Sequence, residues 1–298
     1  MSEHWQDRPE AGSSLAIRIT IWIALRLGRR ALSIVLYPTA LYFLCVRGSE
    51  RRASKAFLQR VTGKRATLWQ VYLHFLTFAR ITADRVFFLA GHTDQMPLEV
   101  FGFDLMEQHL QAGRACIVLG SHVGSQEAMR QASVRHPGIT VRLVLDRQSN
   151  RQLVERLEAL DPEFAAALID ADQSSASLGL AISDALKLGD SVGFLGDRYR
   201  PGDRTTSCEF LGSPAKFPVG PFIIASIFRA PVVTVFGIYV DGRYEVHCEE
   251  LFDSFHLPRE DRDAALQAAV SRYAERLEQY IRCAPNNWFN FYDFWKTD

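Results

Sequence analysis

The sequence predicts an α/β protein in which helices flank a mostly parallel central sheet, preceded by a helical segment that associates with a membrane. From about residue 100, apolar β-branched runs alternate with helical stretches, the order typical of a parallel sheet. The 298 residues are 48% hydrophobic, which is enough for a large core. Before residue 100 the pattern is helical throughout. We therefore expect an N-terminal helical membrane-associating region over 1–92 and an α/β domain over 93–298.

Charge is distributed unevenly along a chain whose net charge is zero. Residues 1–90 hold 14 Lys and Arg against 5 Asp and Glu, a net +9, and the remainder carries −9. The zero bulk charge argues against a chain that binds nucleic acid, while the basic N-terminal part indicates an anionic partner. The alternative is a basic face that is simply solvated.

The first predicted element is a helix over residues 15–30. Its four arginines are Arg18, Arg26, Arg29 and Arg30. At 100° per residue they fall within an arc of roughly 120°, and Ile and Leu side chains occupy the rest of the helix. Such a helix suits a membrane interface, where guanidinium groups meet lipid phosphates. The alternative is an amphipathic helix packed on the protein's own core.

An uncharged run over residues 31–46 follows this helix. It is shorter than the ~20 residues that a spanning helix needs, and Pro38 interrupts it. We expect a membrane-embedded hairpin or a monotopic anchor, with the basic block at 47–65 on the cytoplasmic side. The next stretch, 66–92, is predicted to be a helix rich in aromatic residues, in which His74 is a packed core histidine.

The α/β part contains five candidate strands and five candidate helices. The expected strands are 115–119, 140–145, 191–195, 231–239 and 243–249. The expected helices are 124–135, 149–160, 174–188, 219–229 and 260–283. The chain ends in a tail with six aromatic residues between positions 288 and 295.

Cysteine spacing predicts no metal site. The five cysteines are Cys45, Cys116, Cys208, Cys248 and Cys283. No two stand at C-x-x-C spacing, and no group of His and Cys has the spacing of zinc ligands. We expect no bound metal and no resident cofactor. Scattered thiols in odd number fit a reducing compartment, and no small-residue cleavage site ends a short apolar stretch as in a secretory signal.

The strongest candidate for chemistry is His122, in the turn after the strand at 115–119. Reactive groups gather at the carboxyl ends of strands in open α/β sheets. Glu127 lies five residues on, about 140° around a helix, so it must fold back to reach the ring. A carboxylate on one ring nitrogen fixes the tautomer, and the other nitrogen can take a proton from a hydroxyl. The alternative is a histidine that caps the helix beside a solvated glutamate.

Two other stretches compete with His122. Ser191 lies in a G-x-S-x-G match, but a helix precedes it and a strand follows, the reverse of a nucleophile elbow. Asp197 and Arg198 follow the strand at 191–195 and would flank the same crevice as His122. Alone, such a pair is often only a loop salt bridge.

Four blocks occur in order along the chain. They are SHVGSQE at 121–127, LDRQSN at 145–150, FLGDRYRPGD at 194–203 and FLGSPAKFPVGPFIIA at 210–225. Together they resemble the bacterial lipid A biosynthesis (lauroyl/myristoyl) acyltransferases, within the glycerolipid and lysophospholipid acyltransferase superfamily. The block ERRASKAFLQRV at 50–61 and the aromatic tail are most similar to acyltransferases of aryl-polyene-type lipid clusters. The resemblance covers nearly the whole chain.

The resemblance implies an O-acyltransferase at the cytoplasmic face of the bacterial inner membrane. His122, oriented by Glu127, would act as general base on a hydroxyl of a lipid or glycolipid acceptor. That hydroxyl would attack an acyl thioester of acyl carrier protein or coenzyme A. No covalent acyl-enzyme is needed, which fits a chain without a credible Ser or Cys nucleophile.

The same resemblance, with the glycine turn, supplies candidate substrate-binding residues. They are Gly120, Ser121, Gly124, Arg147, Asn150, Asp197 and Arg198. The glycines allow a tight turn and a close approach of substrate, and backbone N–H groups around them are candidates to stabilise the oxyanion. The alternative for Arg147 is a surface salt bridge.

The tail departs from the family pattern. Where the lipid A enzymes carry His and Arg after a tryptophan, this chain reads WFNFYDFW with Asp293, which argues against lipid A itself as acceptor. Two other functions stay open. One is a hydrolase or thioesterase that uses water in the same crevice. The other is a non-catalytic membrane-binding protein with a degenerate site.

Overall fold

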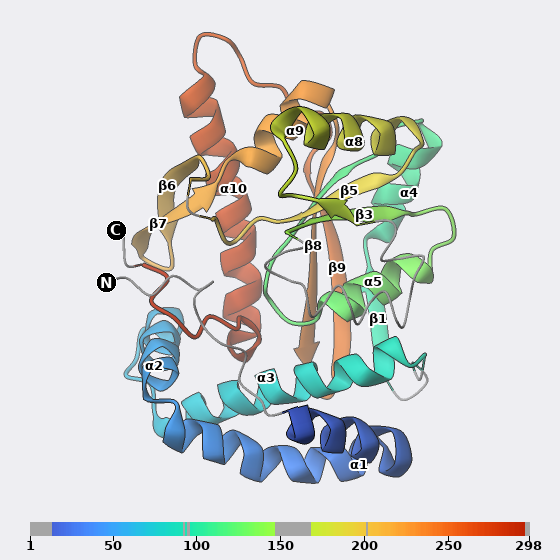
Figure 1. Cartoon of the computed structure of the whole chain (residues 1–298). Coiled ribbons are helices and arrows are strands. Elements are labelled where there is room, and N and C mark those ends of the chain that lie inside the picture. Colours follow the sequence, from blue (N-terminus) through green and yellow to red (C-terminus); the bar gives the residue numbers. More distant parts are fainter. Residues whose placement is uncertain (1–13, 92, 94–95, 147–167, 201, 296–298) are drawn as a thin grey trace.

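The computed structural model describes residues 14–91, 93, 96–146, 168–200 and 202–295, with the side chains of 14–25 and 27 left out of the description. Three helices come first and lie at the bottom of Figure 1. They are α1 (Ser14–Val46), α2 (Gly48–Thr62) and α3 (Leu68–Leu89). α3 begins at a capping box, in which Thr67 and Gln70 each accept from the other's backbone N–H.

α1 consists of two helices that meet at a break at Gly28, where φ is 77° and ψ is 178°. Its second half lies along α3 (Figure 1) and buries Leu32, Leu36 and Ala40, which are spaced four residues apart. This second helix continues through Pro38, so the chain turns at Gly28 and not at the proline. The membrane-embedded hairpin stays a prediction, and so does the alternative of a monotopic anchor.

The arginines of α1 do not share one exposed face. Arg29 turns inward, and its Nε and Nη2 donate to the two carboxylate oxygens of Asp84 at 3.1 and 2.7 Å. Asp84 is only 2% exposed and also accepts from the Tyr244 hydroxyl at 2.8 Å. A buried carboxylate needs a cationic partner, so the amphipathic pattern fails at this position. Arg26 and Arg30 are exposed, as expected.

A seven-stranded sheet forms the centre of the α/β part, in the order β1-β9-β8-β2-β5-β3-β4. The last five strands in that order run parallel, β9 is antiparallel to β8, and β1 is parallel to β9. The prediction of a mostly parallel sheet is therefore confirmed. The strands are β1 (Leu98–Phe101), β2 (Ile117–Gly120), β3 (Val141–Leu145), β4 (Ile169–Asp170), β5 (Ser191–Leu195), β8 (Val232–Val240) and β9 (Arg243–Phe252).

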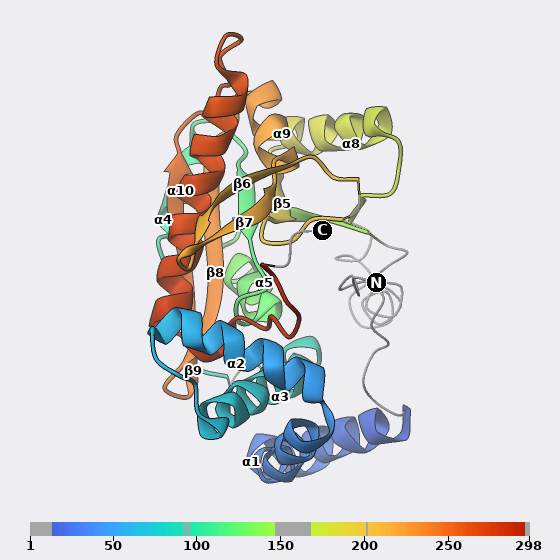
Figure 2. The ribbon, with the colours of Figure 1, turned by 90° about the vertical axis from the view of Figure 1, so that its left-hand side faces the viewer.

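Helices cover both faces of this sheet (Figure 2), with α4 and α10 on one face and α5, α8 and α9 on the other. Their bounds are α4 (Phe103–Gln111), α5 (Gln126–Val134), α8 (Ser175–Lys187), α9 (Gly220–Phe228) and α10 (Arg262–Cys283). The expected elements of this part are present within a few residues, except that the helix expected over 149–160 lies outside the described residues.

Some elements were not predicted. They are β1, β4, α4, and an antiparallel hairpin of β6 (Thr205–Phe210) and β7 (Ser213–Pro218). The hairpin lies against α10, and a short 3-10 turn (Pro285–Asn287) leads from α10 into the aromatic tail. The missed pieces are short or carry Ser, Pro and Lys, so they lack the apolar runs by which strands are recognised.

The carboxyl ends of the parallel strands face the N-terminal helices. Figure 1 shows the arrowhead of β8 pointing toward α3, and β2 and β5 run parallel to β8. The turns that follow β2 and β5 therefore lie at the edge of the sheet nearest α3 and α1. Buried side chains from α1 through the tail form one continuous core cluster. A division of the chain at residues 92 and 93 stays a prediction.

Candidate active site

The turn between β2 and α5 is tightly fixed. Gly124 has φ of 66°, and a Cβ there would overlap the carbonyl oxygen of Gly237 on β8. The backbone N–H of Gly124 donates to the Asn287 carbonyl, and that of Ser125 donates to the Gly237 carbonyl, both at 2.7 Å. Because only glycine tolerates both the backbone angle and the close approach, Gly124 keeps the turn pressed against β8 and the tail.

His122 is held in this turn by Asp197, which follows β5. The ring Nδ1 lies 2.8 Å from Asp197 Oδ1, and the backbone N–H of His122 donates to Asp197 Oδ2 at 3.1 Å. Asp197 is completely buried, while the His122 side chain is 25% exposed. The indole N–H of Trp288 donates to the same Oδ2 at 3.1 Å. The carboxylate thus joins the turn, the β5 end and the tail.

This geometry sets the protonation state of the pair. Burial lowers the pKa of His122, the positive charges of Arg198 and Arg85 lower it further, and Asp197 opposes them. Burial alone would raise the pKa of Asp197, but its contacts with His122, Arg198 and Trp288 hold it well below its usual range. An ionised carboxylate only accepts hydrogen bonds, so Nδ1 carries the proton of the neutral ring. Nε2 is then the basic nitrogen, and no described residue hydrogen-bonds to it.

Glu127 does not contact the His122 ring, which corrects the expected pairing. Its Oε1 lies 2.9 Å from Nε of Arg85 on α3, and its Oε2 accepts from the Ser125 hydroxyl at 3.4 Å. Ser125 caps α5, since its hydroxyl oxygen accepts from the Ala128 N–H at 3.1 Å. This cap starts the helix at residue 126 and turns Glu127 toward α3 instead of back toward the ring. The partner of the imidazole is therefore Asp197.

Gly120 and Ser121, two of the other predicted site residues, lie at the end of β2 and directly after it. Gly120 ends β2, and its carbonyl accepts from Gly196 N–H at 3.0 Å and the Tyr273 hydroxyl at 2.7 Å. Ser121 is buried, and its hydroxyl oxygen accepts from the Val123 N–H at 3.2 Å. Both residues shape the turn through these bonds, and their contact with substrate stays a prediction.

Arg198 follows Asp197 on the β5 side of the site. Its Nη2 donates to the Phe289 carbonyl of the tail at 3.0 Å, and its charged group lies 5.5 Å from the Tyr292 ring centre. Asp197 contacts the His122 ring, and the charge of Arg198 acts on it, so both residues lie beside His122. Their contact with substrate stays a prediction. Arg147 and Asn150 lie outside the described residues.

Four backbone donors in the turn are already engaged, so these four are not candidates to stabilise an oxyanion. The N–H groups of His122, Val123, Gly124 and Ser125 donate to Asp197, Ser121, Asn287 and Gly237, respectively. The turn needs these bonds to hold its shape, so the four donors are unavailable to a substrate. Positive charge near His122 comes instead from Arg198 and Arg85.

Ser191 is excluded as a nucleophile by its burial. It begins β5, is fully buried, and its hydroxyl oxygen accepts from the Cys116 N–H at 3.1 Å. The rejection of the nucleophile elbow is confirmed. Burial also raises the pKa of the Cys116 thiol to about 12, which leaves it protonated and unreactive.

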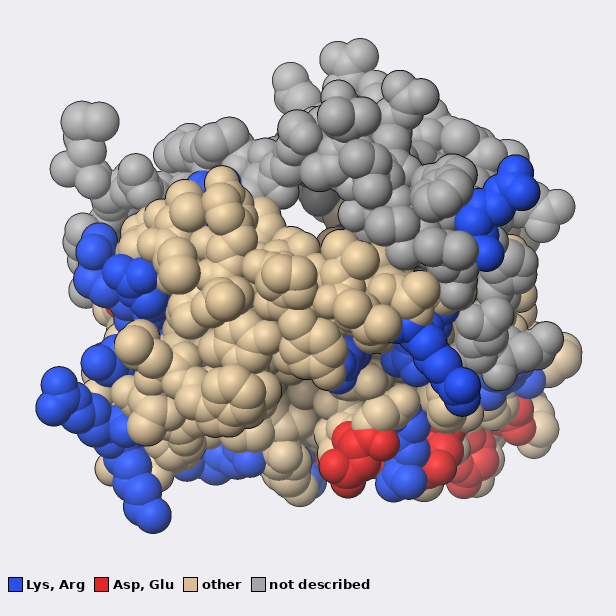
Figure 3. All heavy atoms as spheres, turned by 90° about the horizontal axis from the view of Figure 1, so that it is seen from below, with Lys and Arg blue, Asp and Glu red and all other residues tan. Residues whose placement is uncertain are grey.

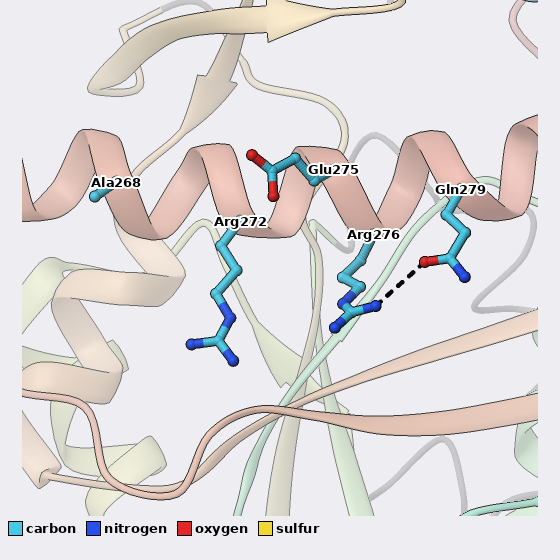
Figure 4. Close-up of a pocket in the computed structure, with 5 residues that line it drawn as sticks. All are labelled: Ala268, Arg272, Glu275, Arg276 and Gln279. Atoms are coloured by element: carbon cyan, nitrogen blue, oxygen red, sulfur yellow. Dashed lines mark hydrogen bonds between the residues drawn. The ribbon is translucent and has the colours of Figure 1, made fainter.

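A side-chain cluster and a pocket lie away from His122. His109, Glu250 and Asp253 cluster near α4, but Arg114 donates to His109 Nδ1 at 3.0 Å and to Asp253 at 2.9 Å and so already engages two of the three groups. A pocket of about 450 Å³ lies on α10 (Figure 4). It is lined by Ala268, Arg272, Glu275, Arg276 and Gln279, which belong to one helix and include none of the site residues.

Sequence reasoning missed three parts of the site. Trp288 was noted only as one aromatic residue of the tail, and no spacing links it to Asp197, 91 residues earlier. Arg85 lies in the helix predicted over 66–92, where the aromatic residues are the evident pattern. Tyr273 belongs to the apolar stripe of α10, and its hydroxyl reaches the end of β2. Each of these contacts arises from the tertiary fold and carries no local sequence pattern.

A basic histidine nitrogen at a strand end, oriented by a buried aspartate, is an arrangement suited to general-base catalysis. The chain matches the family model for bacterial lipid A biosynthesis acyltransferases over residues 12–297 and belongs to that family. It is therefore an acyltransferase, and the family implies an acyl thioester as donor and a lipid as acceptor. No curated protein sequence matches the chain. The closer likeness to enzymes of aryl-polyene-type clusters stays a prediction.

Proposed function

We propose that the protein transfers a fatty acyl group from an acyl thioester to a hydroxyl of a bacterial lipid or glycolipid, with His122 as general base. The single observation that supports this most strongly is the contact of Nδ1 with Asp197, which leaves Nε2 as the basic nitrogen at a partly exposed site. Acyl carrier protein or coenzyme A would carry the acyl group as co-substrate, without a resident cofactor.

The proposed reaction proceeds in two steps. Nε2 removes the proton of the acceptor hydroxyl as its oxygen attacks the thioester carbonyl, which gives a tetrahedral intermediate and an imidazolium. The C–S bond then breaks, the ester is released, and the thiolate leaves with the proton that His122 carried. Atoms and charges balance, and His122 returns to its neutral state.

Asp197 and the two arginines have separate roles in this scheme. The Asp197 carboxylate stabilises the imidazolium that forms between the two steps. The guanidinium groups of Arg198 and Arg85 direct positive charge toward His122, and we assign them the stabilisation of the developing oxyanion. Glu127 holds Arg85 in place and so supports the reaction without touching the imidazole.

The surface formed by α1 supports attachment to the inner membrane. Gly28–Val46 is long and apolar enough to cross a membrane by length and composition alone, with mean hydropathy 1.2. Ile34, Leu41 and Tyr42 are 70%, 52% and 60% exposed on it. Figure 3 shows a broad area without charged side chains on this face, bordered by Lys and Arg and, along one edge, also by Asp and Glu. We propose that α1 lies on the cytoplasmic leaflet and places the site edge of the sheet next to lipid acceptors.

The test supplies purified protein with radiolabelled acyl-coenzyme A or acyl carrier protein and a total bacterial lipid extract. We expect labelled lipid whose ester bond is cleaved by mild alkali. Release of free fatty acid with no labelled lipid would replace the transferase by a thioesterase. Absence of any thioester turnover under both donors would indicate the non-catalytic membrane-binding alternative.

A further inference from the structure

We propose that Trp288 is a positioning residue for the reaction, because its indole N–H fixes the carboxylate that orients His122. This inference rests on the proposed function, since it assigns Trp288 a task in the same general-base step.

The carboxylate of Asp197 is held from several directions. Oδ1 meets the ring Nδ1 of His122 at 2.8 Å, and Oδ2 accepts both the His122 backbone N–H and the Trp288 indole N–H, each at 3.1 Å. Both Asp197 and Trp288 are fully buried. Without the indole, Oδ2 would keep one donor, and the carboxylate would hold the imidazole in a less defined orientation.

Trp288 is itself anchored by α2 and α3. Its carbonyl oxygen lies 3.0 Å from Nε2 of His74, whose Nδ1 lies 2.8 Å from the Ser54 hydroxyl. A carbonyl only accepts, so Nε2 carries the proton and the Ser54 hydroxyl donates to Nδ1. Burial lowers the pKa of His74 to about 4, which keeps this tautomer neutral. A buried chain of hydrogen bonds therefore runs from Ser54 to His122.

Aromatic packing fixes the indole ring in the same way. The ring of Trp288 meets those of Phe57, Phe210 and Phe294 edge-on, with centroids 5.2, 5.4 and 4.9 Å apart. Rings packed on several sides leave the indole one orientation, which aims Nε1 at Asp197. The same rings keep water from the back of the carboxylate, so the indole N–H is the donor on that side.

The charges around Asp197 decide what loss of the indole N–H would do. The groups that face Asp197 are His122, its neighbour Arg198, Tyr273 on α10 and Tyr292 of the tail. Burial raises the pKa of both tyrosines, to about 12 for Tyr292, so they stay neutral. Removal of a donor makes the carboxylate more basic, and a more basic carboxylate raises the proton affinity of His122. The acidic limb of the rate profile should then move to higher pH.

The test compares Trp288→Phe with Trp295→Phe in the full chain. Trp295 belongs to the same aromatic cluster, but its indole N–H donates to the Phe210 carbonyl at 3.2 Å and does not reach Asp197. The free energy of one hydrogen bond to a charged group corresponds to about a tenfold change in rate. We therefore expect Trp288→Phe to lower kcat about tenfold with little change in KM. The acidic limb of the pH–rate profile of Trp288→Phe should move to higher pH by about one unit. The acidic limb of Trp295→Phe should match that of the wild type.

A second variant separates the N–H from the packing. Benzothienylalanine at position 288 replaces the N–H by sulfur in a ring of nearly the same shape, so it should fold if Trp288→Phe does not. We expect the same fall in kcat and the same shift of the limb. Wild-type kcat and limb in a folded benzothienylalanine protein would overturn the inference. The proposed function fails separately, when His122→Ala retains full transfer whatever position 288 holds.

Discussion

His122 and Asp197 carry different charges at neutral pH, and the proposed catalysis depends on that difference. Burial, Arg198 and Arg85 lower the pKa of His122, so the ring is a neutral base at rest. Asp197 stays ionised because its contacts hold its pKa well below the usual range. The transfer rate should therefore remain level as pH falls from neutral and decline only below the usual histidine value of about 6.5.

Replacement of Asp197 by Asn should stop the reaction without weakening substrate binding. The amide nitrogen of the new side chain would donate to Nδ1, which forces the proton onto Nε2 and removes the base. We expect kcat to fall by about 10²-fold or more with KM within about threefold. The measurement is steady-state transfer from acyl thioester to lipid. A kcat close to that of the wild type would show that Asp197 does not set the tautomer.

Gly124→Ala should destabilise the protein more than Gly63→Ala. Both glycines have φ of +66°, but a Cβ at Gly63 has open space, while at Gly124 it would overlap the Gly237 carbonyl. The backbone strain of about 1–2 kcal/mol is shared, so the difference between the variants measures the overlap. We expect it to exceed about 1 kcal/mol in urea denaturation. Equal losses would mean that the turn can move away from β8.

The candidate site could be predicted in part from the sequence. His122 could be recognised because an apolar run ends at a glycine just before it. Asp197 could be recognised because it follows the predicted strand at 191–195. The orienting carboxylate was assigned wrongly, since Glu127 is nearest in sequence but Asp197 is nearest in space. A capped helix start turns Glu127 toward Arg85, and spacing alone does not reveal a cap of this kind.

At the scale of elements, α2, α3 and the tail meet at His74, which is fully buried. The prediction of a packed core histidine is confirmed. Burial lowers the pKa of His74 to about 4, and the unfolded chain has the ordinary value of about 6.5. Between these values the unfolded state binds a proton that the folded state does not. The contribution of His74 to stability is therefore complete above about pH 6.5 and is lost as pH falls toward 4.

His74→Asn should flatten the dependence of stability on pH. Asn can still meet the Ser54 hydroxyl and the Trp288 carbonyl, but it does not titrate. Between pH 7 and pH 4.5 the wild type should lose up to about 3 kcal/mol more of its free energy of unfolding than the variant. His122 titrates in the same direction in both proteins, so its effect cancels. His256→Asn, at an exposed position, is the control, and a slope for His74→Asn equal to that of this control would contradict the account.

The elements of the α/β part were easier to predict than their connections. β2, β5 and β8 were recognisable as apolar runs bounded by helices, because strands buried on both faces need such residues. α1 was harder, since its composition suits a membrane hairpin and a packed helix equally. The stripe of Leu32, Leu36 and Ala40 that packs against α3 exists only in the folded chain.

At the scale of the whole molecule, the site and the apolar surface of α1 lie on the same side. The carboxyl ends of the parallel strands point toward α3, and α1 lies along α3 with its outer face exposed (Figure 1). A lipid acceptor would then reach His122 from the membrane. The aqueous thioester donor would approach from the cytoplasm.

Membrane binding should depend on where exposed apolar residues lie. Ile34, Leu41 and Tyr42 replaced together by Ser should weaken flotation with phosphatidylethanolamine–phosphatidylglycerol vesicles about tenfold or more. The matched control replaces Leu180, Leu188 and Ile227, which are 62%, 72% and 66% exposed on and beside α8 and α9. We expect the control to float like the wild type. Equal loss in both triple variants would argue against α1 as the membrane-facing element.

The most direct test of the central claim is the rate of acyl transfer to lipid by His122→Ala, measured beside His256→Ala in the full chain. His256 is exposed and lies outside the site, so its variant should retain wild-type transfer. We predict that His122→Ala forms labelled lipid about 10²- to 10⁴-fold more slowly, while it keeps a cooperative melting transition and unchanged vesicle binding. Transfer by His122→Ala within twofold of the wild type would contradict it.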